Sequence, residues 1–114
     1  MRRTVLIVDD HADFRAAARA LLEGAGLAVI GEAATGSEAI EAAARLEPEI
    51  VLLDIQLPDR DGFAVAERLA ATCAVVLISG RDASTFGPRL ARASARGFIP
   101  KRELSGAALV SLVG

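Results

Sequence analysis

Short apolar runs alternate with helix-type segments along the whole chain of 114 residues. The first run, Thr4–Val8, is continuous and rich in β-branched residues, which is typical of a strand buried on both faces of a parallel sheet. The alternation predicts βαβ units, and therefore one α/β domain with helices on both faces of the sheet. We predict further strands at Leu27–Ala33, Ile50–Asp54, Ala74–Ser79 and Arg96–Ile99, and helices at Ala12–Glu23, Gly36–Leu46, Gly62–Ala71, Pro88–Ala93 and Glu103–Val113.

The helical segments have apolar faces at helical spacing, with one irregular exception. In the first helix, Arg15 and Arg19 fall opposite the apolar stripe and are expected to form a solvated face. Gly87-Pro88 interrupts the fourth helical segment, and proline is best placed in a first turn, so that helix should be irregular. The residues expected to face the core are Phe14, Ala17, Ala18, Leu21 and Leu22 in the first helix and Ala39, Ile40, Ala43 and Ala44 in the second.

The composition excludes several classes of function. A net charge of −2 without a basic stripe argues against nucleic-acid binding by this chain alone, and Trp and Tyr are absent as stacking platforms. No apolar run reaches the 18 residues of a membrane span, and the N-terminus lacks the features of a secretory signal, so we expect a cytoplasmic location. Cys73 is the only cysteine, which excludes an internal disulfide, and its apolar neighbours predict a buried thiol.

Polar residues follow four of the predicted strands at the point where each strand ends. Asp9 and Asp10 follow the first strand, Asp54 ends the third, Ser79 ends the fourth and Lys101 follows the fifth. The carboxyl ends of parallel strands share one edge of a sheet, where ligands bind. Three carboxylates, a hydroxyl and an ammonium are therefore expected to meet there.

This set of groups predicts phosphoryl chemistry assisted by a hard cation. Adjacent carboxylates repel each other unless a cation lies between them, and oxygen ligands beside phosphate favour Mg²⁺. Asp54, near the middle of the sheet, is placed to attack phosphorus and form an acyl phosphate, and the backbone carbonyl of Gln56 can complete the metal shell. The alternative for Asp9 and Asp10 is a solvated loop in which Asp10 caps the next helix. His11 is a poor ligand for Mg²⁺, and we expect it only to start that helix.

The motifs together resemble one known family. The sequences Val-Leu-Ile-Val-Asp9-Asp10-His11, Leu-Leu-Asp54 with Pro58 and Gly62, Ile-Ser79-Gly80 and Gly97-Phe98-Ile-Pro100-Lys101 are similar to the receiver domain of bacterial two-component response regulators. The similarity spans the chain in order and is strongest to receivers attached to helix-turn-helix transcriptional regulators. It implies a doubly wound sheet of five strands in the order 2-1-3-4-5, with about five helices. The short stretch between Asp54 and Ser79 predicts a shortened third helix.

The resemblance also implies the role of each residue. Asp54 would be the phosphoacceptor, and Asp9, Asp10, Asp54 and the Gln56 carbonyl would hold Mg²⁺. Ser79 would bind the phosphoryl group and Lys101 would be its counter-ion, while Phe98 would rotate on activation. The donor would be a sensor histidine kinase or a phosphotransfer protein. The chain would catalyse only its own phosphorylation and dephosphorylation, and a homodimer through helix four, strand five and helix five is compatible with the family.

Three other classes of function fit this sequence less well. A phosphorylation-independent receiver that acts as a protein-binding module would keep the fold and explain the irregular fourth helix. An aspartyl phosphatase needs carboxylates two positions apart and a cap domain, and a Rossmann nucleotide site needs glycines where Asp9, Asp10 and His11 stand. We expect residues 1–114 to form one receiver domain, either acting alone or taken from a longer DNA-binding regulator.

Overall fold

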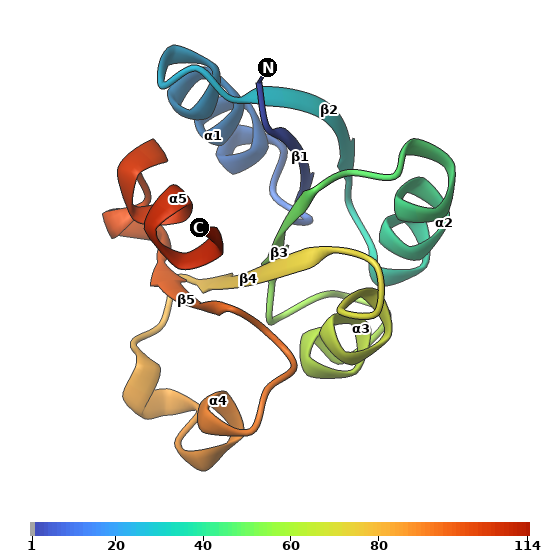
Figure 1. Cartoon of the computed structure of the whole chain (residues 1–114). Coiled ribbons are helices and arrows are strands. Elements are labelled where there is room, and N and C mark those ends of the chain that lie inside the picture. The colour runs from blue at the N-terminus through green and yellow to red at the C-terminus, as the bar shows by residue number, and fades with distance from the viewer. Residues whose placement is uncertain (1) are drawn as a thin grey trace.

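A parallel sheet of five strands organises the computed structural model, which describes residues 2–114. The strands lie in the order β2-β1-β3-β4-β5, which confirms the predicted doubly wound fold (Figure 1). The strands are β1 (Thr4–Val8), β2 (Ala28–Ala33), β3 (Ile50–Asp54), β4 (Ala74–Ser79) and β5 (Gly97–Pro100). The α-helices are α1 (Ala12–Gly24), α2 (Gly36–Leu46), α3 (Gly62–Leu69), α4 (Pro88–Ala91) and α5 (Gly106–Val113), with 3₁₀ turns η1 (Ala83–Thr85) and η2 (Lys101–Glu103).

Two apolar layers enclose the sheet, one on each face. Helices α1 and α5 cover one face, and α2 and α3 cover the other (Figure 1). Within β1, Val5 and Ile7 belong to the layer of α1 and α5, whereas Leu6 and Val8 belong to the layer of α2 and α3. Because successive side chains of a strand point to opposite faces, a strand covered on both sides must be apolar throughout. This explains the continuous apolar runs of the sequence.

The predicted helix faces were partly wrong. Ala18 and Leu22 of α1 are buried and Phe14 is half-buried, but Ala17 and Leu21 are exposed. Of the four α2 residues that were predicted to face the core, Ala44 is exposed. Ala42, which was not among them, is buried. Periodicity identified both helices correctly, but the width of the buried stripe depends on how closely each helix lies on the sheet.

Side-chain caps set where the later helices begin. The Ser105 hydroxyl accepts a hydrogen bond from the Ala108 amide (3.0 Å), so α5 begins at Gly106 and not at Glu103 as predicted. The preceding residues Lys101–Glu103 form the 3₁₀ turn η2. Asp61 caps α3 in the same way through the Phe63 amide (2.9 Å). Helix α3 ends at Leu69, two residues earlier than predicted, which agrees with the expected shortening.

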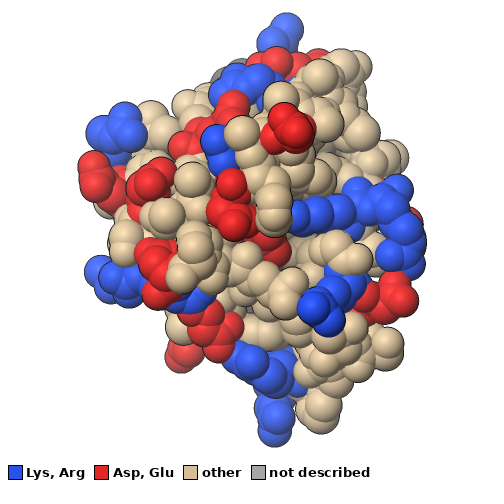
Figure 2. Space-filling view, turned by 180° about the vertical axis from the view of Figure 1, so that it is seen from behind, with Lys and Arg blue, Asp and Glu red and all other residues tan. Residues whose placement is uncertain are grey.

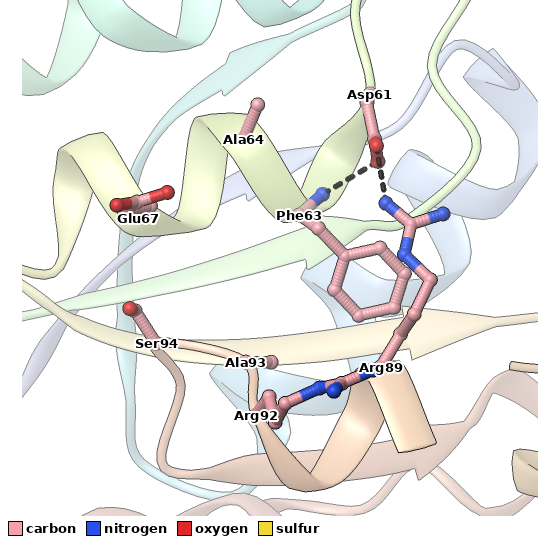
Figure 3. Close-up of a pocket in the computed structure, with 8 residues that line it drawn as sticks. All are labelled: Asp61, Phe63, Ala64, Glu67, Arg89, Arg92, Ala93 and Ser94. Carbon is pink, nitrogen blue, oxygen red and sulfur yellow. Dashed lines mark hydrogen bonds and ion pairs between the residues drawn. The ribbon is translucent and has the colours of Figure 1, made fainter. Parts of the chain in front are cut away.

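Helix α4 is a single turn on the surface of the molecule. It contains no buried residue, and Gly87 before it has φ of 55°, a conformation that glycine adopts without strain. Arg89 reaches across to α3, where it pairs with Asp61 and lies 4.3 Å from the centre of the Phe63 ring. A cavity of about 460 Å³ separates α3 from the segment that carries α4 (Figure 3). The predicted irregularity of this helix is confirmed.

Charged side chains of both signs are distributed over the surface. On the face in Figure 2, acidic side chains gather toward the centre and left, a short row of basic side chains lies on the right, and neutral residues separate them. Between residues 2 and 114, no helix is both long enough and apolar enough to cross a membrane.

Candidate functional site

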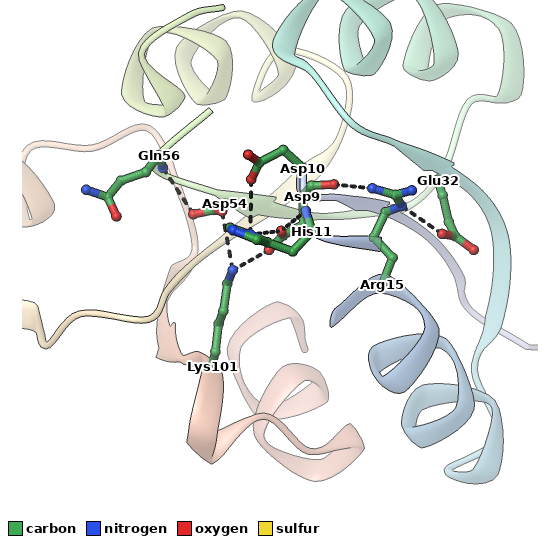
Figure 4. A network of polar contacts seen from close by, with 8 residues as sticks. All are labelled: Asp9, Asp10, His11, Arg15, Glu32, Asp54, Gln56 and Lys101. Atoms are coloured by element: carbon green, nitrogen blue, oxygen red, sulfur yellow. Dashed lines mark hydrogen bonds and ion pairs between the residues drawn. The ribbon is translucent and has the colours of Figure 1, made fainter. Parts of the chain in front are cut away.

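Three carboxylates converge at the carboxyl edge of the sheet, as the sequence predicted (Figure 4). Strands β1 and β3 are neighbours, with Val8 opposite Leu53, so Asp9 and Asp54 occupy the next positions along the two strands. Asp10 follows in the loop to α1. One oxygen from each carboxylate and one ring nitrogen of His11 all lie within 4.8 Å of one another.

Asp9 is the innermost of these groups and is fully buried. Its Oδ1 accepts a hydrogen bond from the His11 amide (2.8 Å). Its Oδ2 forms an ion pair with Lys101 Nζ, 2.5 Å away, and makes no further contact of hydrogen-bond geometry with residues 2–114. Burial of a carboxylate is costly without a positive partner, and Lys101 supplies that partner here.

Asp54 is also almost completely buried, with 3% of its surface exposed. Its Oδ1 accepts a hydrogen bond from the Gln56 amide (3.0 Å), and its Oδ2 lies 3.4 Å from Lys101 Nζ. Burial raises the pKa of the Asp54 carboxyl, and the charge of Asp9 acts in the same direction. The Gln56 amide and Lys101 oppose this rise without cancelling it.

The charges of the cluster do not balance by themselves. Asp9, Asp10 and Asp54 contribute three negative charges when ionised, and Lys101 contributes one positive charge. A divalent cation among these oxygens would restore neutrality. The acidic cluster can therefore bind a metal, and its oxygen donors favour a hard ion.

Ser79 and Phe98 lie apart from this cluster of charges. Ser79 ends β4 one position beyond Ile78, the residue opposite Asp54, and its hydroxyl accepts a hydrogen bond from the Arg81 amide (3.0 Å). Phe98 is half-buried on the face of α2 and α3, and its ring meets that of Phe86 edge to face, with the two centres 6.1 Å apart. Ser79 is thus at the predicted edge but bonded within its own loop.

The structure also shows contacts that the sequence analysis missed. Arg15 and Arg19 do not form a free solvated face, because both bind the carboxylate of Glu32 on β2 (2.9 Å each), and their hydrogen bonds hold its pKa below the usual range. Arg15 also donates a hydrogen bond to the Asp9 carbonyl (2.6 Å). His11 does start α1, as predicted, but its ring lies against the acidic cluster. Cys73 is half-buried, although the sequence predicted a buried thiol.

The match to a family model decides what kind of domain this is. The model for the response regulator receiver domain matches residues 5–113. The chain belongs to this family.

The receiver has relatives among regulators of transcription. It is 40% identical over 102 residues to a putative transcriptional regulator of Pseudomonas aeruginosa, covering 87% of this chain and 49% of that protein. It is 38% identical over 106 residues to the virulence factors putative positive transcription regulator BvgA of Bordetella pertussis, covering 90% of this chain and 51% of that protein. The chain thus spans about half the length of these curated relatives. The predicted likeness to receivers of transcriptional regulators is confirmed.

A solved structure agrees with this assignment over the whole domain. The receiver domain of the putative response regulator NarL from Mycobacterium tuberculosis is 31% identical, with a TM-score of 0.84, and the match covers 99% of this chain and 98% of that one.

Proposed function

We propose that this receiver accepts a phosphoryl group on Asp54, in a Mg²⁺-dependent reaction, from a phosphohistidine of a sensor kinase or phosphotransfer protein. One observation carries the proposal: Lys101 contacts both buried carboxylates, Asp9 and Asp54, at a site where three acidic side chains converge. A surface loop needs neither this burial nor this excess of negative charge. A phosphoryl site needs both a reactive carboxylate and a place for a cation.

The metal would be held by Asp9, Asp10, Asp54 and the backbone carbonyl of Gln56. When bound, Mg²⁺ would neutralise charge on the phosphoryl oxygens as they approach. The chain's own residues hold the acceptor in position, because the Gln56 amide binds Asp54 Oδ1 while Lys101 lies beside Oδ2. With both oxygens oriented, little rotation of the carboxylate is needed before reaction.

In the transfer, an Asp54 oxygen forms a bond to phosphorus while the nitrogen–phosphorus bond of the donor breaks. The leaving imidazole takes up a proton, and Lys101 neutralises charge on the transferred group. Ser79 would then release the Arg81 amide and bind a phosphoryl oxygen. Movement of Ser79 would favour rotation of Phe98 and alter the face formed by α4, β5 and α5, through which we propose that the receiver meets its partner or a second copy.

The test is phosphorylation by a small phosphodonor. Acetyl phosphate with Mg²⁺ should add the mass of one phosphoryl group to the intact protein, and chelation of the metal should prevent this. Asp54→Asn should remain unmodified. Asp59→Asn is the matched control, because Asp59 lies in the same loop but binds the amides of Gly36 and Ser37, away from the cluster. It should be modified as the parent protein is.

The same experiment separates a phosphoacceptor from a phosphorylation-independent binding module. The exposure of α4 favours a receiver that signals by protein contact alone, since no residue of that helix is buried. Such a module needs no metal. A parent protein that neither binds Mg²⁺ in the millimolar range nor gains mass would contradict the phosphoacceptor proposal and favour the contact module.

A further inference from the structure

The ammonium group of Lys101 contacts an aromatic ring as well as the two buried carboxylates. Its Nζ lies 4.5 Å from the centre of the Phe14 ring, within the range of a cation–π interaction. The same atom pairs with Asp9 Oδ2 and lies 3.4 Å from Asp54 Oδ2 (Figure 4). Only 18% of the Lys101 side chain is exposed, so little of it remains in contact with water.

Phe14 stands apart from the other aromatic residues. Phe63, Phe86 and Phe98 lie on the face of α2 and α3, where their rings meet edge to face. Within residues 2–114, Phe14 is the one aromatic residue that packs in the layer of α1 and α5, and it is only half-buried there. Phe14 therefore joins no aromatic cluster, and its interaction beyond apolar packing is with Lys101.

The first turns of α1 hold Phe14 in this position. Arg15, the next residue, donates hydrogen bonds to the Asp9 carbonyl (2.6 Å) and to Glu32 on β2 (2.9 Å). These contacts fix the rotation of α1 beside the end of β1. Because neighbouring residues of a helix rotate together, the same contacts fix the direction of Phe14.

A lysine at this site needs a partner that the reaction leaves unchanged. The ammonium is a compact charge on a long flexible stem, and it turns toward water unless neighbouring groups restrain it. Asp9 and Asp54 restrain it in the free protein, but the metal ion and the phosphoryl group would draw on the same carboxylate oxygens. The Phe14 ring is the contact of Nζ that neither of them uses.

We propose that Phe14 is a positioning residue for phosphoryl transfer, because its ring holds the Lys101 ammonium at the carboxyl edge of the sheet while the carboxylates bind the metal ion and the phosphoryl group. The inference rests on the proposed function, in which Lys101 is the counter-ion of that group. Without the ring, Lys101 spends part of its time turned toward solvent. The rate then falls with the fraction of molecules that remain competent.

Substitutions that keep the size of the side chain but change its ring test this role. With acetyl phosphate and Mg²⁺, intact mass measurement should show Phe14→Leu gaining the phosphoryl group about fivefold more slowly than the parent protein. Phe14→Tyr keeps an electron-rich ring face and should restore the rate to within about twofold. Trifluorophenylalanine and then pentafluorophenylalanine at position 14 should slow the reaction progressively, because fluorine withdraws electrons from the ring face and leaves the side chain apolar.

Phe63→Leu is the matched control. Phe63 is also half-buried beneath a cation, but that cation is Arg89, on the far side of the sheet from Phe14. The variant should keep the parent rate. Equal slowing in Phe14→Leu and Phe63→Leu would show a general loosening of the fold and would overturn the specific role of Phe14.

Nuclear magnetic resonance of the metal-free protein measures the restraint on Lys101 itself. Lys101 is the only lysine of the chain, so ¹³C-labelled lysine gives a single Cε signal. Its order parameter should fall in Phe14→Leu and recover in Phe14→Tyr. An unchanged rate or an unchanged order parameter in Phe14→Leu would overturn the role of Phe14 and leave the phosphoacceptor function intact. If the parent protein gained no phosphoryl group, both proposals would fail.

Discussion

At the scale of single residues, Asp54 is charged in surroundings that oppose its charge. Its carboxyl is buried beside Asp9, and its pKa is raised for that reason. Between the ordinary pKa of 3.8 and the raised value, the folded protein binds more protons than the unfolded chain. Stability without metal therefore falls as the pH rises through this window.

Asp54→Asn should stabilise the metal-free protein, because it removes a buried negative charge and keeps the shape of the side chain. At pH 7 in the presence of a chelator, we expect the free energy of unfolding to rise by about 1 kcal/mol. For a domain of this size that raises the Tm by about 4 °C. Thermal unfolding followed by circular dichroism measures this, and the gain should shrink when the pH is lowered toward 4.

Asp59 provides a control, because its pKa is shifted in the opposite direction to that of Asp54. It accepts hydrogen bonds from the first-turn amides Gly36 (2.8 Å) and Ser37 (3.0 Å) of α2, and these bonds lower its pKa. Its contribution to stability is present above the pKa of the unfolded chain and is lost as the pH falls. Asp59→Asn should therefore lower the Tm at pH 7 and have little effect in acid. If both variants shifted the Tm in the same direction at pH 7, the electrostatic account of Asp54 would be wrong.

Sequence reasoning predicted some of these residues and not others, for a physical reason. Asp9, Asp54 and Lys101 were predictable because each follows a strand, and the strands of a parallel sheet end together. The pairing of Arg15 with Glu32 was not, because it depends on how α1 is rotated on the sheet. The direction of the His11 ring was missed for a related reason, since the backbone conformation at the start of α1 sets it.

At the scale of elements, the segment between β4 and β5 has the weakest support. Helix α4 has one turn and no buried residue, although Phe86 and Leu90 pack partly against the layer of α2 and α3. Arg89 connects this helix to the cap of α3, since Asp61 binds both the Phe63 amide and the Arg89 guanidinium. The loop that ends at Asp61 begins at Asp54, so this contact links α4 to the candidate phosphoacceptor.

Arg89→Ala should loosen α4 without unfolding the protein. The ion pair with Asp61 and the stacking on Phe63 are largely exposed, and such contacts stabilise a protein by less than about 1 kcal/mol each. By hydrogen exchange and mass spectrometry, amides of residues 86–95 should exchange severalfold faster. Arg92→Ala is the matched control, because Arg92 lines the same cavity and should leave exchange unchanged. Equal acceleration in both variants would contradict a specific role for Arg89.

The ends of the helices and strands differ from the prediction more than their order does. All five strands and five α-helices were predicted, and β1, β3, β4 and α2 had the predicted bounds. The predicted start of α5 at Glu103 was wrong, because Ser105 caps the helix and Gly106 begins it. The free-energy difference between two helix starts only a few residues apart cannot be read from the local sequence.

At the scale of the whole molecule, the two apolar layers depend on the same strands. The central strands β1, β3 and β4 contribute side chains to both layers, so loss of the sheet would disrupt both layers together. The acidic cluster is attached to two of these strands through Asp9 and Asp54. A ligand that binds the cluster should therefore stabilise both layers together.

Mg²⁺ should raise the stability of the whole domain. At a concentration ten times its Kd, it should raise the free energy of unfolding by about 1.4 kcal/mol. This corresponds to a rise in Tm of about 6 °C for a chain of this length. Hydrogen exchange should slow by a similar factor in α2 and in α5, which lie on opposite faces of the sheet.

Asp10→Asn is the control for this stabilisation, because Asp10 is exposed and its replacement removes one ligand without disturbing the core. The variant should keep the Tm of the metal-free parent and lose most of the increase at the same Mg²⁺ concentration. Protection confined to the loops after β1 and β3, with α2 and α5 unchanged, would show that metal binding and global unfolding are separate events. The shared strands argue for the opposite result, since the acidic residues that would hold the ion extend directly from the most buried part of the sheet.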